Sequence, residues 1–174
     1  MMEGKVYWIT GLSGAGKTTI GKALYARMKE DYPAVVLLDG DAMREAVGDV
    51  FGYTPNDRFK CAMYYSRLCK MIAEQTITVI CCTVSMFDDV REWNRKNISD
   101  YFEVYIKVNQ DTLYKRDQKG LYSGLMNGTS SKVTGMDIPF EEPKNPDMVL
   151  ENNGDLSVGD CVNIILKQSA IRGG

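Results

Sequence analysis

The chain of 174 residues contains no histidine, and its five cysteines form no Cys-x-x-Cys pair. Protein zinc sites rely on histidine and cysteine, and histidine is the most frequent acid–base catalyst. The sequence therefore argues against a zinc site and against histidine catalysis. The odd cysteine count, with Cys81 and Cys82 adjacent in an apolar run, favours reduced thiols in a core and a cytoplasmic location.

The sequence also lacks an excess of either charge and a long apolar run. It has 21 Lys and Arg residues against 23 Asp and Glu residues, a net charge of −2. Nucleic-acid-binding domains usually carry a basic excess, and a membrane helix needs about 18 or more consecutive apolar residues. We therefore expect no nucleic-acid partner, no membrane span and no signal peptide ahead of the first predicted strand.

A glycine-rich stretch from Gly11 to Thr18, the phosphate loop, organises the rest of the chain. It follows the β-branched and aromatic residues 6–9 and precedes a helical pattern over about 16–30, as a phosphate-binding loop requires. Its backbone N–H groups can surround phosphate oxygens at the positive end of that helix. We expect Lys17 to reach the β- and γ-phosphates and Thr18 to ligate Mg²⁺. The predicted ATP site comprises Gly11, Leu12, Ser13, Gly14, Ala15, Gly16, Lys17, Thr18 and Thr19.

Strand-like and helix-like patterns alternate along the chain. Strands are predicted over 4–10, 35–38, 76–84, 102–108 and 148–150. Helices are predicted over about 16–30, shortly after Asp41, from Asn56 or Asp57 to about 75, and over 88–97, 111–117 and 157–169. This order predicts an α/β fold of the P-loop NTPase type, with a parallel sheet between helices in a single domain spanning 1–174. The weakly periodic stretch 118–147 is long enough to favour a functional segment.

Asp39 and Asp41 follow the second predicted strand, at the sheet edge where ligands bind in such folds. Residues i and i+2 of an extended segment point the same way, and Gly40 between them allows close approach of a substrate. One carboxylate is expected to hold Mg²⁺ and the other to accept the proton of an acceptor hydroxyl. Asp39 joins Thr18 as our candidate metal site and Asp41 is our candidate base, although the residues alone leave these two roles interchangeable.

Three arginines flank the predicted cleft. Arg44 and Arg58 suit the oxygens of a second anionic ligand, because guanidinium groups match phosphate and sulfate geometry. Arg116 opens the irregular stretch and could neutralise charge on a transferring phosphoryl group. On local evidence, a charged helix end accounts for Arg116 equally well.

Taken together, these segments resemble the adenylylsulfate kinase family along nearly the whole chain. The matching segments are GLSGAGKTT (11–19), LDGDAMR (38–44), GYTPNDR (52–58), FEVYIKV (102–108), RDQKGLY (116–122) and VTGMDIPFEEPKNPD (133–147). The resemblance implies phosphorylation of the 3′-hydroxyl of adenosine 5′-phosphosulfate, a small-molecule nucleotide, with ATP and Mg²⁺. It places Asp41 at that hydroxyl, Arg44 and Arg58 on the phosphosulfate, and a lid over about 116–135. Further implied substrate contacts are Tyr53, Cys61, Val84, Ser85, Lys119, Gly120, Leu121, Val133 and Thr134. We also predict a homodimer.

The chain departs from the family pattern around the acceptor's base. The family usually has Asn-Ile-Arg-Arg where this chain has Cys-Ala-Met-Tyr at 61–64, and Met86 replaces a proline. The family clamps adenine between two phenylalanines, whereas this chain has Tyr53 and Val133. Loss of one stacking ring weakens purine binding, because stacking contributes about 1–3 kcal/mol per base.

Four functions remain open at this stage. A kinase for adenosine 5′-phosphosulfate comes first, because the whole-chain resemblance is to such kinases. A kinase for cytidine diphosphoramidate, a precursor of phosphoramidate-modified capsular sugars, is a close second, because a pyrimidine fits the altered base pocket. A catalytically idle nucleotide-binding module is disfavoured, since it needs neither a base nor two anion-binding arginines. A general nucleoside monophosphate kinase would not need Asp39 and Asp41 as a catalytic pair.

Overall fold

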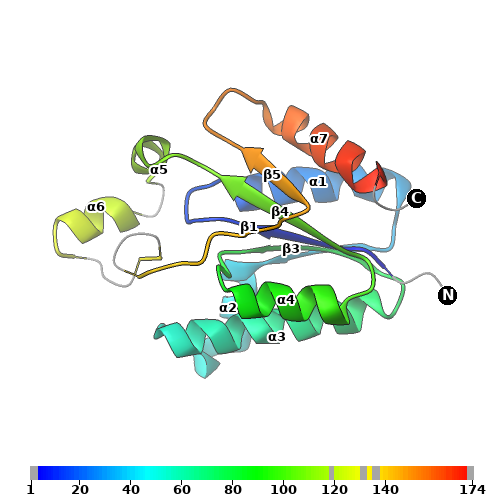
Figure 1. The fold of residues 1–174 in the computed structure, drawn as a ribbon, viewed down its shortest axis with the longest axis horizontal. Helices are drawn as coiled ribbons and strands as arrows, with labels where there is room; N and C mark the ends of the chain where they lie inside the picture. The colour runs from blue at the N-terminus through cyan, green and yellow to red at the C-terminus, as the bar shows by residue number, and fades with distance from the viewer. Residues whose placement is uncertain (1–3, 118–119, 130–132, 135–137, 172–174) are drawn as a thin grey trace.

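Five parallel strands form one sheet in the computed structural model, which describes residues 4–117, 120–129, 133–134 and 138–171 (Figure 1). The strands are β1 (Val6–Thr10), β2 (Val35–Asp39), β3 (Thr78–Thr83), β4 (Tyr101–Lys107) and β5 (Met148–Glu151). Their order across the sheet is β2-β3-β1-β4-β5, so the strand that leads into the phosphate loop lies at the centre. The predicted α/β fold with a parallel sheet is confirmed.

The sheet has a hydrophobic core on each face, because alternate residues of a strand point to opposite sides. Tyr7 and Ile9 of β1 pack with α1 (Lys17–Asp31) and α7 (Val158–Ile171). Val6 and Trp8 pack on the other face with α3 (Pro55–Ala73) and α4 (Asp88–Asn97). Figure 1 shows these two helix layers on either side of the strands. All five residues of β1 are buried, as expected for a strand covered on both faces.

Shorter elements lie beside the carboxyl ends of the strands. They are α2 (Gly40–Val47), the 3₁₀ helix η1 (Gly48–Val50), α5 (Gln110–Arg116) and α6 (Leu121–Met126). Because all strands run parallel, the residues that follow β1, β2, β3 and β5 meet at this one edge of the sheet. None of the helices in the described ranges is long and apolar enough to cross a membrane.

Two local predictions were wrong. The N-cap of α3 is Thr54, not Asn56 or Asp57, because Pro55 suits the first helical position and Thr54 and Asp57 form a reciprocal capping box. The stretch 118–147 contains the six-residue helix α6, which its weak apolar periodicity did not indicate. The carboxylate of Asp117 holds the start of α6 by accepting hydrogen bonds from the N–H groups of Tyr122 and Ser123 at 3.0 and 2.8 Å.

Candidate active site

The phosphate loop connects the central strand β1 to α1. Gly16 precedes the helix in a left-handed conformation with φ 99°, and the first N–H groups of α1 have no partners within the helix. Lys17 folds back over the loop and donates a hydrogen bond of 2.7 Å from Nζ to the carbonyl oxygen of Leu12. The loop therefore presents backbone donors and one ammonium group at the same edge of the sheet.

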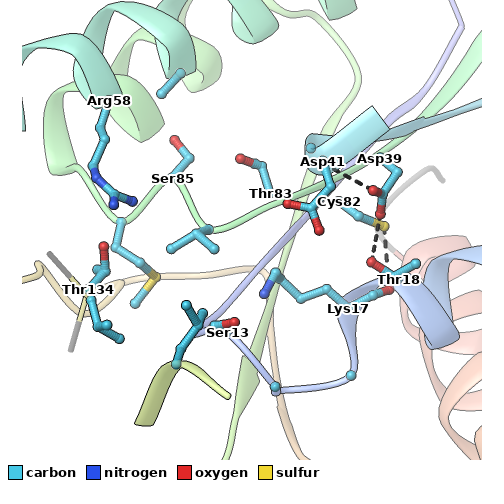
Figure 2. Close-up of a pocket in the computed structure, with 18 of the residues that line it drawn as sticks. Ser13, Lys17, Thr18, Asp39, Asp41, Arg58, Cys82, Thr83, Ser85 and Thr134 are labelled. Carbon is cyan, nitrogen blue, oxygen red and sulfur yellow. Dashed lines mark hydrogen bonds between the residues drawn. The ribbon is translucent and has the colours of Figure 1, made fainter. Parts of the chain in front are cut away.

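A hydrogen bond joins the phosphate loop to the end of β2. Thr18 Oγ1 donates to Asp39 Oδ2 at 2.6 Å, and Asp39 Oδ1 accepts from the N–H groups of Asp41 and Ala42. The prediction that Asp39–Asp41 is an extended segment is wrong, because α2 begins at Gly40 and Asp39 is its N-cap. Asp41 instead occupies the first turn of α2, and Figure 2 shows both carboxylates on the side of Lys17 and Thr18.

Tyr65, which the sequence analysis did not select, fixes the turn between the two carboxylates. Its side chain is buried on α3, and its hydroxyl donates to the carbonyl oxygen of Gly40 at 3.2 Å. A Cβ at Gly40 would lie 3.0 Å from the Cys82 carbonyl oxygen, so the turn also packs tightly against β3. Burial raises the pKa of Tyr65 well above its usual range, which keeps the hydroxyl a donor. The available signal was a tyrosine on the buried face of a helix, where its hydroxyl needs a partner.

Two arginines surround Tyr53 at the start of α3. Arg44 donates from Nη1 to the carbonyl oxygens of Phe51 and Gly52 at 2.9 and 3.1 Å, and its guanidinium lies 4.6 Å from the centre of the Tyr53 ring. Arg58 donates from Nε to the Tyr53 carbonyl oxygen at 3.1 Å and lies 5.7 Å from the same ring. The predicted pair of anion-binding arginines is thus brought together, since both guanidinium groups contact the same exposed Tyr53 ring.

Ser85 follows β3 in the same cleft as Arg58 (Figure 2). It is 6% exposed, and within the described residues its Oγ has no hydrogen-bond partner. A buried hydroxyl without a partner is costly, so this position favours a ligand that supplies one. In Figure 2, Arg58, Ser85 and Thr134 lie on one side, Thr18 and Asp39 on the other, and Asp41 and Thr83 between them.

Three apolar side chains from separate parts of the chain also line the cleft: Cys61 belongs to the core under α3, and Val133 packs with Leu113 and Tyr122. Cys61, Met86 and Val133 are 3%, 3% and 4% exposed, and all three line the same cavity. None of them offers a strong hydrogen-bonding group or a flat ring. At these three positions the cleft can therefore contact a ligand chiefly by shape and apolar surface.

One cleft of about 710 Å³ contains most of the predicted site. Its lining includes Ser13, Gly14, Gly16, Lys17, Thr18, Thr19, Asp39, Asp41, Arg44, Tyr53, Arg58, Cys61, Val84, Ser85, Arg116, Leu121, Val133 and Thr134. Four predicted residues do not line it: Gly11, Leu12, Ala15 and Gly120. Leu12 packs against Leu113, Tyr122 and Val133, and Ala15 is fully buried. Lys119 and parts of the predicted lid lie outside the described residues.

The cleft also includes residues that the sequence analysis missed. Besides Tyr65, they include Ile20, Ala62, Cys82, Thr83, Phe87, Ile138, Pro139, Asn152, Gly154, Leu156, Val158 and Cys161. Thr83 and Asn152 lie at the carboxyl ends of β3 and β5, where the fold alone predicts ligand contacts. Burial, with a smaller contribution from the nearby Asp39 charge, raises the pKa of the Cys82 thiol to about 12, so this cysteine stays protonated at neutral pH.

The residues around Thr18 fit a magnesium ion that is shared with a substrate. Within the described ranges, no three or more His, Cys, Asp or Glu side chains form a metal-binding cluster. Thr18 and Asp39 nevertheless place a hydroxyl and a carboxylate in direct contact beside the phosphate loop. Mg²⁺ prefers such oxygen ligands and usually takes the remainder from water and substrate phosphates.

Comparison with known proteins defines the class of this site. The family model described as adenylylsulphate kinase matches residues 3–151. The chain is 38% identical over 166 residues to the cytidine diphosphoramidate kinase of Campylobacter jejuni, covering 95% of this chain and 96% of the relative. It is 37% identical over 165 residues to the adenylyl-sulfate kinase of Clostridium kluyveri, covering 94% and 82%.

A solved structure agrees with these sequence matches. The fold matches the Mycobacterium tuberculosis APS kinase in complex with AMPPNP and APS, with a TM-score of 0.88, 28% identity and coverage of 97% and 98%. The fold and its relatives are those of phosphotransferases with a phosphate loop. The chain belongs to the adenylylsulphate kinase family, and it is a nucleotide kinase of that family.

Proposed function

We propose that this protein transfers the γ-phosphoryl group of ATP to the 3′-hydroxyl of a nucleotide that carries a charged 5′ anhydride. The phosphate loop holds the triphosphate through its backbone N–H groups, and Lys17 neutralises charge on the transferring group. Mg²⁺ bound by Thr18 and Asp39 supplies positive charge at the phosphates. Arg116, which also lines the cleft, adds a second cation. The contact between Thr18 and Asp39 beside Lys17 supports this arrangement.

Asp41 serves as the general base in this proposal. Its carboxylate lies in Figure 2 between the Lys17–Thr18 turn and the group of Arg58 and Ser85. A hydroxyl bound between these two groups meets Asp41 on one side and the γ-phosphate on the other, as in-line transfer requires. The Tyr65 hydrogen bond to Gly40 fixes the turn from which Asp41 projects.

Arg44, Arg58 and Ser85 bind the anionic 5′ group of the acceptor. The two guanidinium groups line one part of the cleft, and the buried Ser85 hydroxyl has no other partner within the described residues. Charge-assisted hydrogen bonds from arginine suit both a phosphosulfate and a diphosphoramidate. The binding of the 5′ group therefore does not distinguish adenosine 5′-phosphosulfate from cytidine diphosphoramidate. Only the base pocket can do so.

We infer that the acceptor is cytidine diphosphoramidate. The observation that carries this choice is that Cys61 and Val133 are both buried in the cleft wall, where the family has asparagine and phenylalanine. Without the second stacking ring, this wall loses affinity for a purine and accommodates a smaller pyrimidine. The relative in Campylobacter jejuni that is named for this activity matches nearly the whole chain.

Adenosine 5′-phosphosulfate is the second candidate. It is favoured by the match to a structure that contains APS and by relatives named adenylyl-sulfate kinase. In either case the homodimer, the single domain over 1–174 and the lid over about 116–135 stay predictions. Size-exclusion chromatography with light scattering tests the dimer.

A coupled ADP-release assay tests the proposed function. Purified protein, ATP and Mg²⁺ are combined in turn with cytidine diphosphoramidate, adenosine 5′-phosphosulfate, CMP and AMP, and ³¹P NMR locates the new phosphate. We expect acceptor-dependent ADP release, a 3′-phosphorylated product, and loss of turnover in Lys17→Ala with the fold intact. A new phosphate on a phosphate oxygen, or turnover in Lys17→Ala within a few-fold of the parent, would contradict the proposal.

A further inference from the structure

We propose that Asn152 is a positioning residue that fixes the orientation of the Ala15–Gly16 peptide in the phosphate loop. Asn152 follows β5 directly, and its Nδ2 donates a hydrogen bond of 2.8 Å to the carbonyl oxygen of Ala15, 137 positions away in the sequence. A carbonyl oxygen can only accept, so the contact itself determines which end of the amide faces Ala15. The inference rests on the proposed binding of a triphosphate by this loop.

Asn152 is anchored in the sheet. Its backbone N–H donates to the Lys107 carbonyl oxygen at 2.9 Å, which extends the pairing of β5 with β4 by one residue. The Asn152 side chain therefore projects toward the phosphate loop from a backbone that is held in the sheet. It also packs directly on Gly16, where an added Cβ would lie 2.7 Å from Nδ2.

The phosphate loop needs such an anchor because glycine permits more than one backbone orientation. Gly16 has φ 99° and ψ 11°, a conformation that side chains disfavour, and as a glycine it rotates away from this conformation at little cost. In a trans peptide the C=O and the N–H point in opposite directions, and no described peptide is cis. When Asn152 holds the Ala15 carbonyl, the Gly16 N–H must point away from Asn152. We infer that this N–H is one of the inward donors that bind phosphate oxygens.

The consequence is measurable in ligand affinity. A single neutral hydrogen bond changes an equilibrium by about two- to tenfold. Without Asn152, part of the population holds the peptide in the flipped orientation, which places a carbonyl oxygen against the phosphates. Triphosphate affinity then falls by up to this factor, and by the same amount whether or not a base is attached. By contrast, substitution of a residue that contacted the adenine directly would weaken binding of ATP but not of tripolyphosphate.

Calorimetric titration of the magnesium complexes of tripolyphosphate and ATP tests this prediction. The variants are Asn152→Ala and Asn152→Leu, which removes the donor but keeps the number and branching of the side-chain heavy atoms. The matched control is Asn153→Ala, because Asn153 accepts a hydrogen bond from the Asn109 N–H away from the phosphate loop. We expect both Asn152 variants to bind both ligands about two- to tenfold more weakly. Asn153→Ala should bind as the parent does, and each of the three variants should melt within a few degrees of the parent.

Two results in the Asn152 variants would overturn the inference alone. Unchanged affinity for both ligands would show that the Asn152 contact does not position the loop. A loss confined to ATP would make Asn152 a contact of the nucleoside. A parent protein that binds neither ligand would instead contradict the proposed function, and the inference with it.

Discussion

The hydroxyl of Thr18 and the carboxylate of Asp39 meet at 2.6 Å and join the first turn of α1 to the end of β2. Asp39 has two tasks at this point, since its other oxygen caps α2 through the N–H groups of Asp41 and Ala42. The helix start and the candidate metal site therefore share one side chain. A substitution at Asp39 that still caps α2 but removes the negative charge can separate the capping role from the role in metal binding.

We predict that Asp39→Asn raises the Mg²⁺ concentration needed for half-maximal activity. Asparagine caps a helix about as well as aspartate, so α2 should be kept, but the negative charge beside Thr18 is lost. Initial rates are measured against Mg²⁺ concentration at saturating ATP. Asp49→Asn, which changes an exposed carboxylate on η1, is the control. An unchanged Mg²⁺ dependence in Asp39→Asn would remove this residue from the metal site.

Asp41→Asn should reduce kcat by roughly 10²–10⁴-fold with little change in the KM for ATP, because general base catalysis contributes about that much. Glu45→Gln, one turn further along α2 and exposed, is the matched control and should behave as the parent does. Steady-state kinetics with the acceptor identified by the ADP-release assay compare kcat and KM between the two variants and the parent. If Asp41→Asn retained full activity, proton removal by this carboxylate would be excluded.

Substitution of Arg44 or Arg58 should weaken binding of the acceptor and leave ATP binding unchanged. Loss of one charge-assisted contact costs about 1.5–3 kcal/mol, so the acceptor KM should rise roughly ten- to a hundredfold in either alanine variant. Both arginines also hold backbone carbonyls near Tyr53, so Arg44→Lys and Arg58→Lys are measured alongside as charge-retaining variants. The exposed Arg67 on α3 provides the control Arg67→Ala. Equal losses for ATP and acceptor would indicate local unfolding instead of acceptor binding.

The cysteines should resist alkylation in the native protein. All five are buried, and burial raises the pKa of Cys82 to about 12. Thiolate is the reactive form, and at pH 8 it is on the order of 10⁻⁴ of the Cys82 population. Reactivity should rise about tenfold for each pH unit and level off only near the raised pKa. Mass spectrometry after iodoacetamide treatment should find Cys82 unmodified at pH 8 and fully modified in denaturant. Modification of native Cys82 at the rate of a free thiol would contradict the buried position and raised pKa of this cysteine.

The sequence predicted the features that depend on local patterns. The apolar run of β1, the spacing of the glycines and the helical period of α1 lie within 25 residues of one another and define the phosphate loop without tertiary information. The alternation of strands and helices was sufficient for the parallel sheet. Both follow from backbone preferences and periodicity.

Other features depended on contacts that a linear pattern does not contain. Asp39 could continue β2 or cap a helix, and the choice depends on whether the chain turns at Gly40. The bond from Tyr65 to Gly40 depends on how α3 is rotated against β3, and that from Asn152 to Ala15 on which strand ends beside the loop. A polar residue next to a strand or a tyrosine in a core gives no sign of its distant partner. The roles of Asp41, Arg44, Arg58 and Arg116 stay predictions until they are measured.

The base preference of the acceptor tests the central claim most directly. The measurement is kcat/KM for cytidine diphosphoramidate and for adenosine 5′-phosphosulfate, in the parent and in the double variant Cys61→Asn with Val133→Phe. We predict a higher kcat/KM for the cytidine acceptor in the parent. The double variant should shift the ratio toward adenosine by at least about fivefold, because it restores a stacking ring. A parent that is highly active on adenosine 5′-phosphosulfate and inactive on every cytidine nucleotide would contradict the account.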